Sequence, residues 1–278
     1  MPSNPRPQII FFGNGPLADA ALEVLSKRTD VIFHARTASD LTTVRELKLT
    51  HPTAFGILAS FGVLIKPDLL DLFASTGGII NLHPSLLPGY RGPSPIESAI
   101  LAGDNTFGYS IMQLSSAMDA GPLYHQATVP DLPLDKSAIY QGLATAGATW
   151  LIRHLDHLGT PTPQIGAPTY TTKLNKSLSL LQPASYTADE IYRQIIAYQG
   201  FPKPKYEFFG KTCIILEAHV LRITDILCEA AGLDGSPDNS PLMLSCADRN
   251  FVVITRLQPE GKKPMDAVSF INGYGKKH

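Results

Sequence analysis

Short apolar runs that alternate with helical patterns fill the first half of this 278-residue chain. Four of these runs, residues 8–13, 30–35, 54–60 and 77–82, are short and rich in aliphatic and aromatic side chains, which predicts buried strands. Between the first two, residues 16–27 place apolar side chains at helical spacing. Strands that alternate with helices build βαβ units, so the sequence predicts an α/β fold with a Rossmann-like, mostly parallel sheet.

The same alternation continues beyond residue 90. It predicts a helix at 95–103, strands at 106–114 and 122–129, and a long helix at 137–158. We therefore expect a first domain that covers residues 1–163.

The composition changes after residue 159, where a segment rich in Pro, Thr and Ser begins. We interpret residues 164–182 as an interdomain linker. Beyond it, Thr187 and Glu190 have the spacing of a capping box, which predicts the start of a helix. Several short β-like runs with glycine turns follow, so we expect residues 183–278 to form a small, OB-like antiparallel β-barrel.

Charge and cysteine usage narrow the class of protein. The chain carries 23 basic and 24 acidic residues, a net charge of −1, which argues against a positively charged coat for non-specific nucleic-acid binding but leaves a local basic face open. Cys213, Cys228 and Cys246 are odd in number and lack C-x-x-C spacing, so we expect buried thiols rather than a disulfide framework or a zinc site. The apolar run near the N-terminus is too short for a signal peptide, and no apolar run of the sequence approaches the length of a membrane span. Both observations favour a cytoplasmic location.

Two features that resemble functional motifs have ordinary interpretations. Residues 13–18 read GNGPLA after a strand, but the next strand ends in His34 and Ala35 without the acid of a dinucleotide site, so we interpret them as a tight strand-to-helix turn. His125, His154 and His157 are expected to be structural or solvated.

A polar pair stands at the end of the fourth predicted strand. Residues 81–96 read NLHPSLLPGYRGPSPI, in which Asn81 and His83 precede a loop stiffened by four prolines. Open parallel sheets bind their ligands at the carboxyl ends of the strands. Side chains alternate between the two faces of a strand, so Asn81 and His83, two residues apart, point to the same side. A later strand is followed by Asp119, which is able to orient a histidine, while an Asn amide offers donors to an oxyanion. From these residues alone, a catalytic and a structural histidine are equal alternatives.

The chain resembles the folate-dependent formyltransferases, and among them the methionyl-tRNA formyltransferase family. The resemblance rests on residues 81–124 with the Asn-x-His, the SLLP loop and the distant Asp, on YTTKLNK at 170–176, and on KTCIILEA at 211–218 and LQPEGKKPMDAVSFING at 257–273. It implies formyl transfer from 10-formyltetrahydrofolate, as co-substrate and without a metal, to the α-amine of initiator methionyl-tRNA by a cytoplasmic monomer.

The resemblance also implies roles for individual residues. The catalytic residues are expected to be Asn81, His83 and Asp119. The expected folate-binding residues are Phe61, Gly62, Val63, Leu64, Ile65, Ser85, Leu86, Leu87 and Pro88. The expected tRNA contacts are Arg36, Arg91, Lys173, Lys176, Lys262 and Lys263.

The sequence departs from the family pattern at two places. The basic, glycine-rich insertion that follows the second strand in the family is absent, and only Arg36 and Arg45 supply positive charge there. Glu97 stands where the family often has Gln. Arg91 has a simpler alternative role, a hydrogen bond that anchors its own loop. For the whole chain, formyl transfer to another amine, such as an amino-sugar nucleotide, and folate or tRNA binding without turnover stay open as alternatives.

Overall fold

The computed structural model describes residues 6–224 and 242–275, so the prediction for Cys228 lies outside the described residues. The chain divides into two compact units. One comprises residues 1–99 and 104–173, and the other comprises 100–103 and 174–278. Within the described ranges, no helix is both long and apolar enough to cross a membrane.

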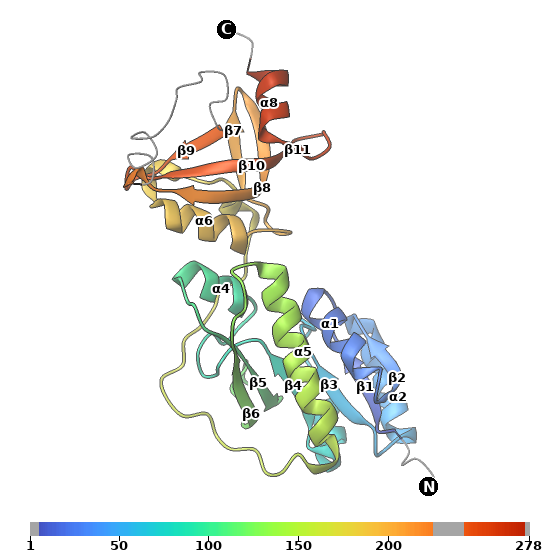
Figure 1. The fold of residues 1–278 in the computed structure, drawn as a ribbon. Coiled ribbons are helices and arrows are strands. Elements are labelled where there is room, and N and C mark those ends of the chain that lie inside the picture. The colour runs from blue at the N-terminus through green and yellow to red at the C-terminus, as the bar shows by residue number, and fades with distance from the viewer. Residues whose placement is uncertain (1–5, 225–241, 276–278) are drawn as a thin grey trace. The chain divides into compact units, whose positions relative to one another are not determined.

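The first unit contains a six-stranded sheet and its covering helices (Figure 1). Its strands are β1 (Gln8–Phe12), β2 (Asp30–Ala35), β3 (Phe55–Leu58), β4 (Ile79–His83), β5 (Phe107–Gln113) and β6 (Leu123–Val129). Its α-helices are α1 (Pro16–Leu25), α2 (Leu41–Thr50), α3 (Pro67–Leu70), α4 (Pro95–Ala102) and α5 (Lys136–His154). The 3-10 turns are η1 (Ala38–Asp40), η2 (Asp71–Thr76) and η3 (Leu155–His157).

The predicted mostly parallel sheet is confirmed. Its strand order is β2-β1-β3-β4-β5-β6. The first four strands run parallel, whereas β5 and β6 are antiparallel to their neighbours. From β1 the chain forms β2 on one side of β1 and then crosses to form β3 on the other side. The carboxyl ends of β1, β3 and β4 therefore lie next to one another along one edge, where open α/β sheets bind ligands.

Two apolar layers hold helices on the two faces of this sheet. Ile9 and Phe11 of β1 belong to the cluster that includes α1 and α5. Ile10 and Phe12 of the same strand belong to the cluster that includes α2 and the η2 turn. Because successive strand residues point to opposite faces, a strand buried on both faces reads as a continuous apolar run, as β1 does.

The second unit is a curled antiparallel sheet with helices packed on it (Figure 1). Its strands are β7 (Lys205–Phe208), β8 (Lys211–Leu221), β9 (Leu242–Ser245), β10 (Phe251–Pro259) and β11 (Met265–Asp266), and its other elements are α6 (Ala188–Ala197), α8 (Ala267–Tyr274), η4 (Lys176–Ser179) and η5 (Pro183–Ser185). Strand β10 is central, with β8 on one side and both β9 and β11 on the other. The small antiparallel β-domain is thus confirmed, as a half-barrel.

The capping box at the start of α6 is also confirmed. Thr187 Oγ1 accepts from the Glu190 N–H at 3.3 Å, and the Glu190 carboxylate accepts from the Thr187 N–H at 2.8 Å. Helix α8 was not predicted from the sequence, although Asp266 caps it by accepting from the Ser269 N–H at 2.7 Å. Phe270 of α8 is fully buried in the core of this unit, so the helix closes one end of the apolar cluster.

Candidate active site

Asn81 and His83 end strand β4 at the carboxyl edge of the sheet. Their side chains are 5% and 4% exposed. In the sheet, Asn81 lies opposite Met112 and His83 opposite Ser110, both on β5. Two residues apart on one strand, the Asn and His side chains point to the same side. Figure 1 shows β4 between β3 and β5, and Asn81 is paired on both sides, with Leu58 of β3 as its second partner, whereas His83 is paired with β5 alone.

Asp119 reaches His83 from the segment between β5 and β6. Its Oδ1 lies 3.8 Å from His83 Nδ1, and its Oδ2 accepts from the Gly92 N–H at 2.8 Å. The backbone of Asp119 is left-handed, with φ of 48°. Asp adopts this conformation more readily than most residues, and such positions are held only where their surroundings fix them. The structure therefore brings His83 and Asp119 together from residues 36 positions apart in the sequence.

The second ring nitrogen of His83 has a backbone partner that the sequence did not indicate. His83 Nε2 lies 3.1 Å from the Tyr90 carbonyl oxygen. A carbonyl only accepts, so in the neutral ring Nε2 carries the hydrogen and Nδ1 carries the lone pair. Nδ1 faces Asp119 across 3.8 Å, too long for a direct hydrogen bond. His83 thus presents a basic nitrogen beside a carboxylate.

Burial lowers the pKa of His83 below its ordinary value of 6.5, and the Asp119 carboxylate and the Tyr90 carbonyl oppose part of this effect. The ring is therefore neutral near pH 7, as a proton acceptor has to be. Once a proton reaches Nδ1, the imidazolium has an acceptor on each side, Asp119 and Tyr90. This arrangement suits a histidine that takes up a proton and then releases it.

The Asn81 amide is uncommitted. None of the hydrogen bonds among residues 6–224 and 242–275 involves its side chain, although the residue is 5% exposed. Its nitrogen and oxygen are also not among the fully buried, unpartnered atoms of the described residues, so the amide retains access to a ligand. Buried polar groups normally find partners, which makes this amide a donor held ready for something outside the chain.

The loop after β4 is fixed by hydrogen bonds from β5 and β6. Ser110 Oγ donates to the Ser85 carbonyl at 2.6 Å and accepts from the Leu87 N–H at 3.0 Å. Gln126 donates to the Leu87 carbonyl at 2.7 Å. Among the four loop residues predicted to contact folate, Ser85 and Leu87 are buried, Pro88 is half-buried, and Leu86 is 36% exposed. Leu86 is thus the side chain of this set that the loop presents outward.

The predicted folate segment 61–65 has free backbone groups. Phe61 and Ile65 are buried in the core, whereas Gly62 and Leu64 are exposed. No backbone hydrogen bond within the described part of the chain uses an N–H or C=O of residues 61–65. The segment is thus tied down at both ends by apolar side chains and offers its backbone donors and acceptors to a ligand.

The residues predicted to contact tRNA do not form one cluster within a unit. Arg36 is exposed directly after β2, with only two residues between β2 and η1. Arg91 donates to Gln164 Oε1 through Nε at 3.1 Å and Nη2 at 2.6 Å, so its guanidinium anchors its own loop. The other four, Lys173, Lys176, Lys262 and Lys263, are exposed. Lys173 belongs to the first unit and the remaining three to the second.

Two residues near the carboxyl edge carried no sequence signal. Gln164 and Thr169 lie in the Pro- and Thr-rich segment, which has no periodicity to place it.

Glu97, where the family often has Gln, is buried and accepts from the Tyr140 hydroxyl at 2.9 Å, with Lys136 Nζ 3.4 Å away. The exchange of an amide for a carboxylate is balanced by a lysine from the next helix.

The other candidates have structural roles. A Cβ on Gly13 would meet the Ala59 carbonyl oxygen at 1.9 Å, so close packing of the turn requires glycine there. His125 and His154 both stack on Trp150, with ring centroids 4.7 and 4.3 Å away. Cys213 and Cys246 of the second unit are buried thiols, and burial raises the pKa of each to about 11. No group of three or more His, Cys, Asp or Glu side chains within 6–224 and 242–275 is arranged to hold a metal ion.

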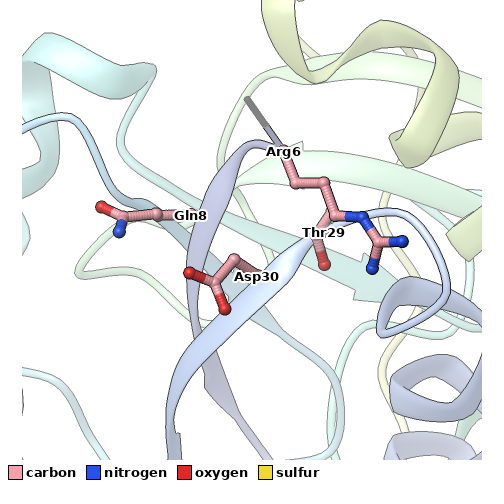
Figure 2. Close-up of a pocket in the computed structure, with 4 residues that line it drawn as sticks. All are labelled: Arg6, Gln8, Thr29 and Asp30. Atoms are coloured by element: carbon pink, nitrogen blue, oxygen red, sulfur yellow. The ribbon is translucent and has the colours of Figure 1, made fainter. Parts of the chain in front are cut away.

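A cavity of about 350 Å³ lies at the opposite edge of the sheet (Figure 2). It is lined by Arg6, Gln8, Thr29 and Asp30, at the amino ends of β1 and β2. Open α/β sheets bind ligands at the carboxyl edge, and the uncommitted amide of Asn81 is on that other edge. Chemistry therefore places the candidate active site at Asn81 and His83.

Comparison with known proteins identifies the family of the chain. The family described as formyl transferase matches residues 14–155, and the formyl transferase C-terminal domain matches 173–275. A methionyl-tRNA formyltransferase from Pseudoalteromonas translucida is 34% identical over 223 residues, 78% of this chain and 68% of that protein. One from Thermus thermophilus is 33% identical over 224 residues, 79% of this chain and 70% of that protein.

Solved structures share the fold at lower identity. HypX from Aquifex aeolicus, in complex with tetrahydrofolic acid, has a TM-score of 0.70 at 17% identity and covers 98% of this chain and 48% of its own. Methionyl-tRNA formyltransferase from Clostridium thermocellum has a TM-score of 0.61 at 17% identity over 77% of this chain and 93% of its own. The sequence matches over both units show that the chain belongs to the formyl transferase family.

Proposed function

We propose that this protein transfers the formyl group of 10-formyltetrahydrofolate to the α-amine of initiator methionyl-tRNA, which prepares that tRNA for translation initiation. The observation that carries the proposal is the pairing of a buried, neutral His83, whose Nδ1 faces Asp119, with the uncommitted Asn81 amide on the same strand. Relatives that are 33–34% identical over about two thirds of their length are named methionyl-tRNA formyltransferases, which supports the choice of amine.

His83 manages the proton in this mechanism. The α-amine forms a C–N bond to the formyl carbon and the bond from that carbon to the folate nitrogen breaks. Nδ1 of His83 takes the proton that the attacking amine loses and returns it to the folate nitrogen as it leaves, through water where the distance requires it. Asp119, 3.8 Å away, stabilises the imidazolium between these events. Such proton transfer contributes roughly 10²–10⁴-fold to a rate.

Asn81 stabilises the charge that develops on the formyl oxygen. As the amine adds, this oxygen becomes an oxyanion, and the Asn81 amide donates a hydrogen bond to it with the protonated His83 nearby. Because the amide has no partner among the described residues, it does not have to break a bond to do so. One such donor is worth about 3 kcal/mol of barrier.

The folate is held by the segments on either side of this pair. Residues 61–65 offer backbone groups without partners among the described residues, which fit the donors and acceptors of a pterin edge. The loop from Ser85 to Pro88, fixed by Ser110 and Gln126, borders the folate and the incoming amine. The folate thus lies against rigid backbone, which fixes the formyl carbon near Asn81 and His83.

The tRNA contacts are proposed at exposed cations. We assign formyl transfer to residues 1–163, the linker to 164–182 and tRNA contacts to 183–278. In the second unit, Lys205, Arg222 and Arg256 are each ion-paired with a carboxylate. Lys262 and Lys263, in the turn between β10 and β11, have no ion pair within the described ranges, which leaves them free for phosphate. We propose that the other tRNA contacts are made by Lys173, Lys176, Arg36 and a remaining donor of Arg91.

Incubation with 10-formyltetrahydrofolate and Met-tRNA tests this function, with formyl transfer measured on the recovered aminoacyl-tRNA. An amino-sugar nucleotide offered in parallel tests the alternative amine, because formyltransferases for sugars share the fold at about 15% identity. His83→Ala is the control, and it should lower turnover by several powers of ten with folate still bound. Transfer only to the sugar, or binding of both substrates without transfer, would replace the proposal. Sedimentation and cell fractionation test the expectation of a cytoplasmic monomer.

A further inference from the structure

Residues 162–171 run along the first unit as an extended strap that contacts the loop after β4. Thr162 pairs with Leu123 of β6 through two backbone hydrogen bonds of 2.7 and 2.9 Å. Further along, the Arg91 N–H donates to the Thr169 carbonyl at 2.9 Å, and the Thr171 N–H donates to the Arg91 carbonyl at 2.7 Å. The strap is thus bound at both ends to the elements that form the candidate active site.

Thr169 fixes the residue whose carbonyl contacts His83. Its Oγ1 accepts from the Tyr90 N–H at 2.8 Å, and its own N–H donates to the Pro88 carbonyl at 3.2 Å. Tyr90 has a left-handed backbone with φ of 57°, which is rare for a bulky residue and persists only where the surroundings over-determine it. Thr169 supplies one of these determinants and the bond from the Tyr90 hydroxyl to Asp104, 2.7 Å long, supplies another.

Gln164 fixes the other acceptor that flanks His83. Its amide nitrogen donates to the carbonyls of Asp119 and Gly121, each at 2.8 Å. Its amide oxygen accepts two bonds from Arg91. One side chain therefore links the left-handed Asp119 to the loop that carries Tyr90, and all of the bonding capacity of its NH₂ group is used.

Both neighbours of the His83 ring are consequently held by the same strap. Tyr90 fixes the ring tautomer through Nε2, and Asp119 faces Nδ1. We propose that Thr169 and Gln164 are positioning residues for the reaction, which hold the Tyr90 carbonyl and the Asp119 carboxylate against the His83 ring. The inference rests on the proposed function, because it assigns these residues to the proton transfer by His83.

The test for Thr169 compares Thr169→Val, which removes the acceptor for the Tyr90 N–H and keeps the shape, with Thr169→Ser, which restores it. Thr172→Val is the matched control, because Thr172 is exposed on the same segment and its hydroxyl makes no hydrogen bond within the described part of the chain. A displaced catalytic group costs about ten- to a hundredfold in rate. We expect kcat for Thr169→Val to fall by that factor with KM for 10-formyltetrahydrofolate unchanged, and Ser to recover it.

The test for Gln164 is Gln164→Glu, which turns a donor into an acceptor opposite two carbonyl oxygens. Gln141→Glu on the exposed face of α5 is its control. We expect the same loss of kcat at unchanged folate binding for Gln164→Glu and none for the control. A loss that is equal in kcat and in folate affinity, or that the controls share, would mean that the strap only supports the fold.

A second readout does not depend on the substrate. ¹⁵N spectra of the histidine rings report which ring nitrogen of His83 carries the hydrogen. Among the described residues, Asp119 is the charged group that faces this ring. The full-length wild type should show the Nε2–H form, and Thr169→Val should show a mixture that Thr169→Ser reverses. An Nε2–H form that persists in Thr169→Val overturns the inference. A wild type that formylates no Met-tRNA removes the proposed function and leaves this spectral test intact.

Discussion

Replacement of Asp119 by Asn tests the charge beside His83 without a change of shape. Asp119 has a left-handed backbone, which Asn tolerates equally well, so the substitution should not strain the chain. The amide oxygen of the new side chain is able to accept the Gly92 N–H bond that Asp119 Oδ2 accepts now, at 2.8 Å. What the variant loses is the negative charge next to Nδ1.

The distance sets the size of the effect. At 3.8 Å, two unit charges attract by about 4 kcal/mol when the effective dielectric constant is ~20. Both side chains are largely buried, so solvent screens this attraction little. If the imidazolium forms in the rate-limiting step, the loss corresponds to about a thousandfold in kcat.

The pH profile of the rate shows in which direction the pKa of His83 moves. His83 has to be neutral to accept a proton, so kcat/KM rises with pH through its pKa in the free enzyme. Burial lowers this pKa and Asp119 opposes that effect, so Asp119→Asn should lower the pKa further and move the rise to lower pH, onto a lower plateau.

Steady-state formylation of Met-tRNA across the acid range measures both quantities, and Asp131→Asn is the matched control. Asp131 is also left-handed, with φ of 56°, but it is exposed between β6 and α5. If the profile of Asp119→Asn stays in place and only folate affinity falls, Asp119 is a binding residue and the argument for the imidazolium fails.

Three further outcomes follow from the same structure. Asn81→Ala should raise the barrier by about 2–4 kcal/mol at little cost in melting temperature, since its amide has no partner within the described residues, and near-normal turnover would remove it from the mechanism. The pKa of His83 in the folded state is below 6.5, so its contribution to stability is complete above that pH and declines at lower pH, where the unfolded chain takes up the proton. Between pH 7.5 and pH 5.5 the melting temperature should therefore fall less for His83→Asn than for wild type, and an equal fall would contradict the lowered pKa. Charge reversal of Lys262 and Lys263 to Glu should weaken tRNA binding and flatten its salt dependence, whose slope is roughly −0.7 to −0.9 per phosphate contact, while an unchanged slope would move the tRNA site to the first unit around Arg36 and Arg91.

The central strands of the first unit were predictable because they are buried on both faces. β1 and β3 read as nearly continuous apolar runs that end at the carboxyl edge, and β4 begins as such a run with Ile79 and Ile80. Asn81 and His83 interrupt such a run within β4, so the sequence revealed both a position in the fold and polar side chains that the core does not need.

The direction of β5, which is antiparallel to both of its neighbours and so runs against the rest of the sheet, was not predictable in the same way. Its apolar pattern identifies a strand, but its direction depends on where the chain returns after the loop at 84–94. The small C-terminal helix α8 gives a weak sequence signal because it has only 8 residues and directly follows short β-like runs, although Asp266 and Ser269 have the spacing of an N-cap.

The strap shows why the linker interpretation captured only part of that segment. Residues rich in Pro and Thr lack both the 3.6- and the 2-residue period, so their sequence indicates an absence of regular structure and says nothing of what they contact. Here Gln164 and Thr169 meet residues 45 and 79 positions away, Asp119 and Tyr90. Such contacts arise only after the sheet has placed its loops.

The position of the strap follows from the strain that it offsets. Tyr90 and Asp119 both adopt left-handed conformations, each of which costs of order 1–3 kcal/mol for a residue other than glycine. The Tyr90 carbonyl and the Asp119 carboxylate flank the His83 ring from these two backbones, and the bond from β4, between His83 Nε2 and the Tyr90 carbonyl, does not fix Asp119. Further bonds are needed to hold both backbones. The hydrogen bonds from Thr169 and Gln164 supply them, each worth about 1 kcal/mol net. A segment without regular structure is suited to this task, because its side chains and its own backbone groups are free to bond to a loop.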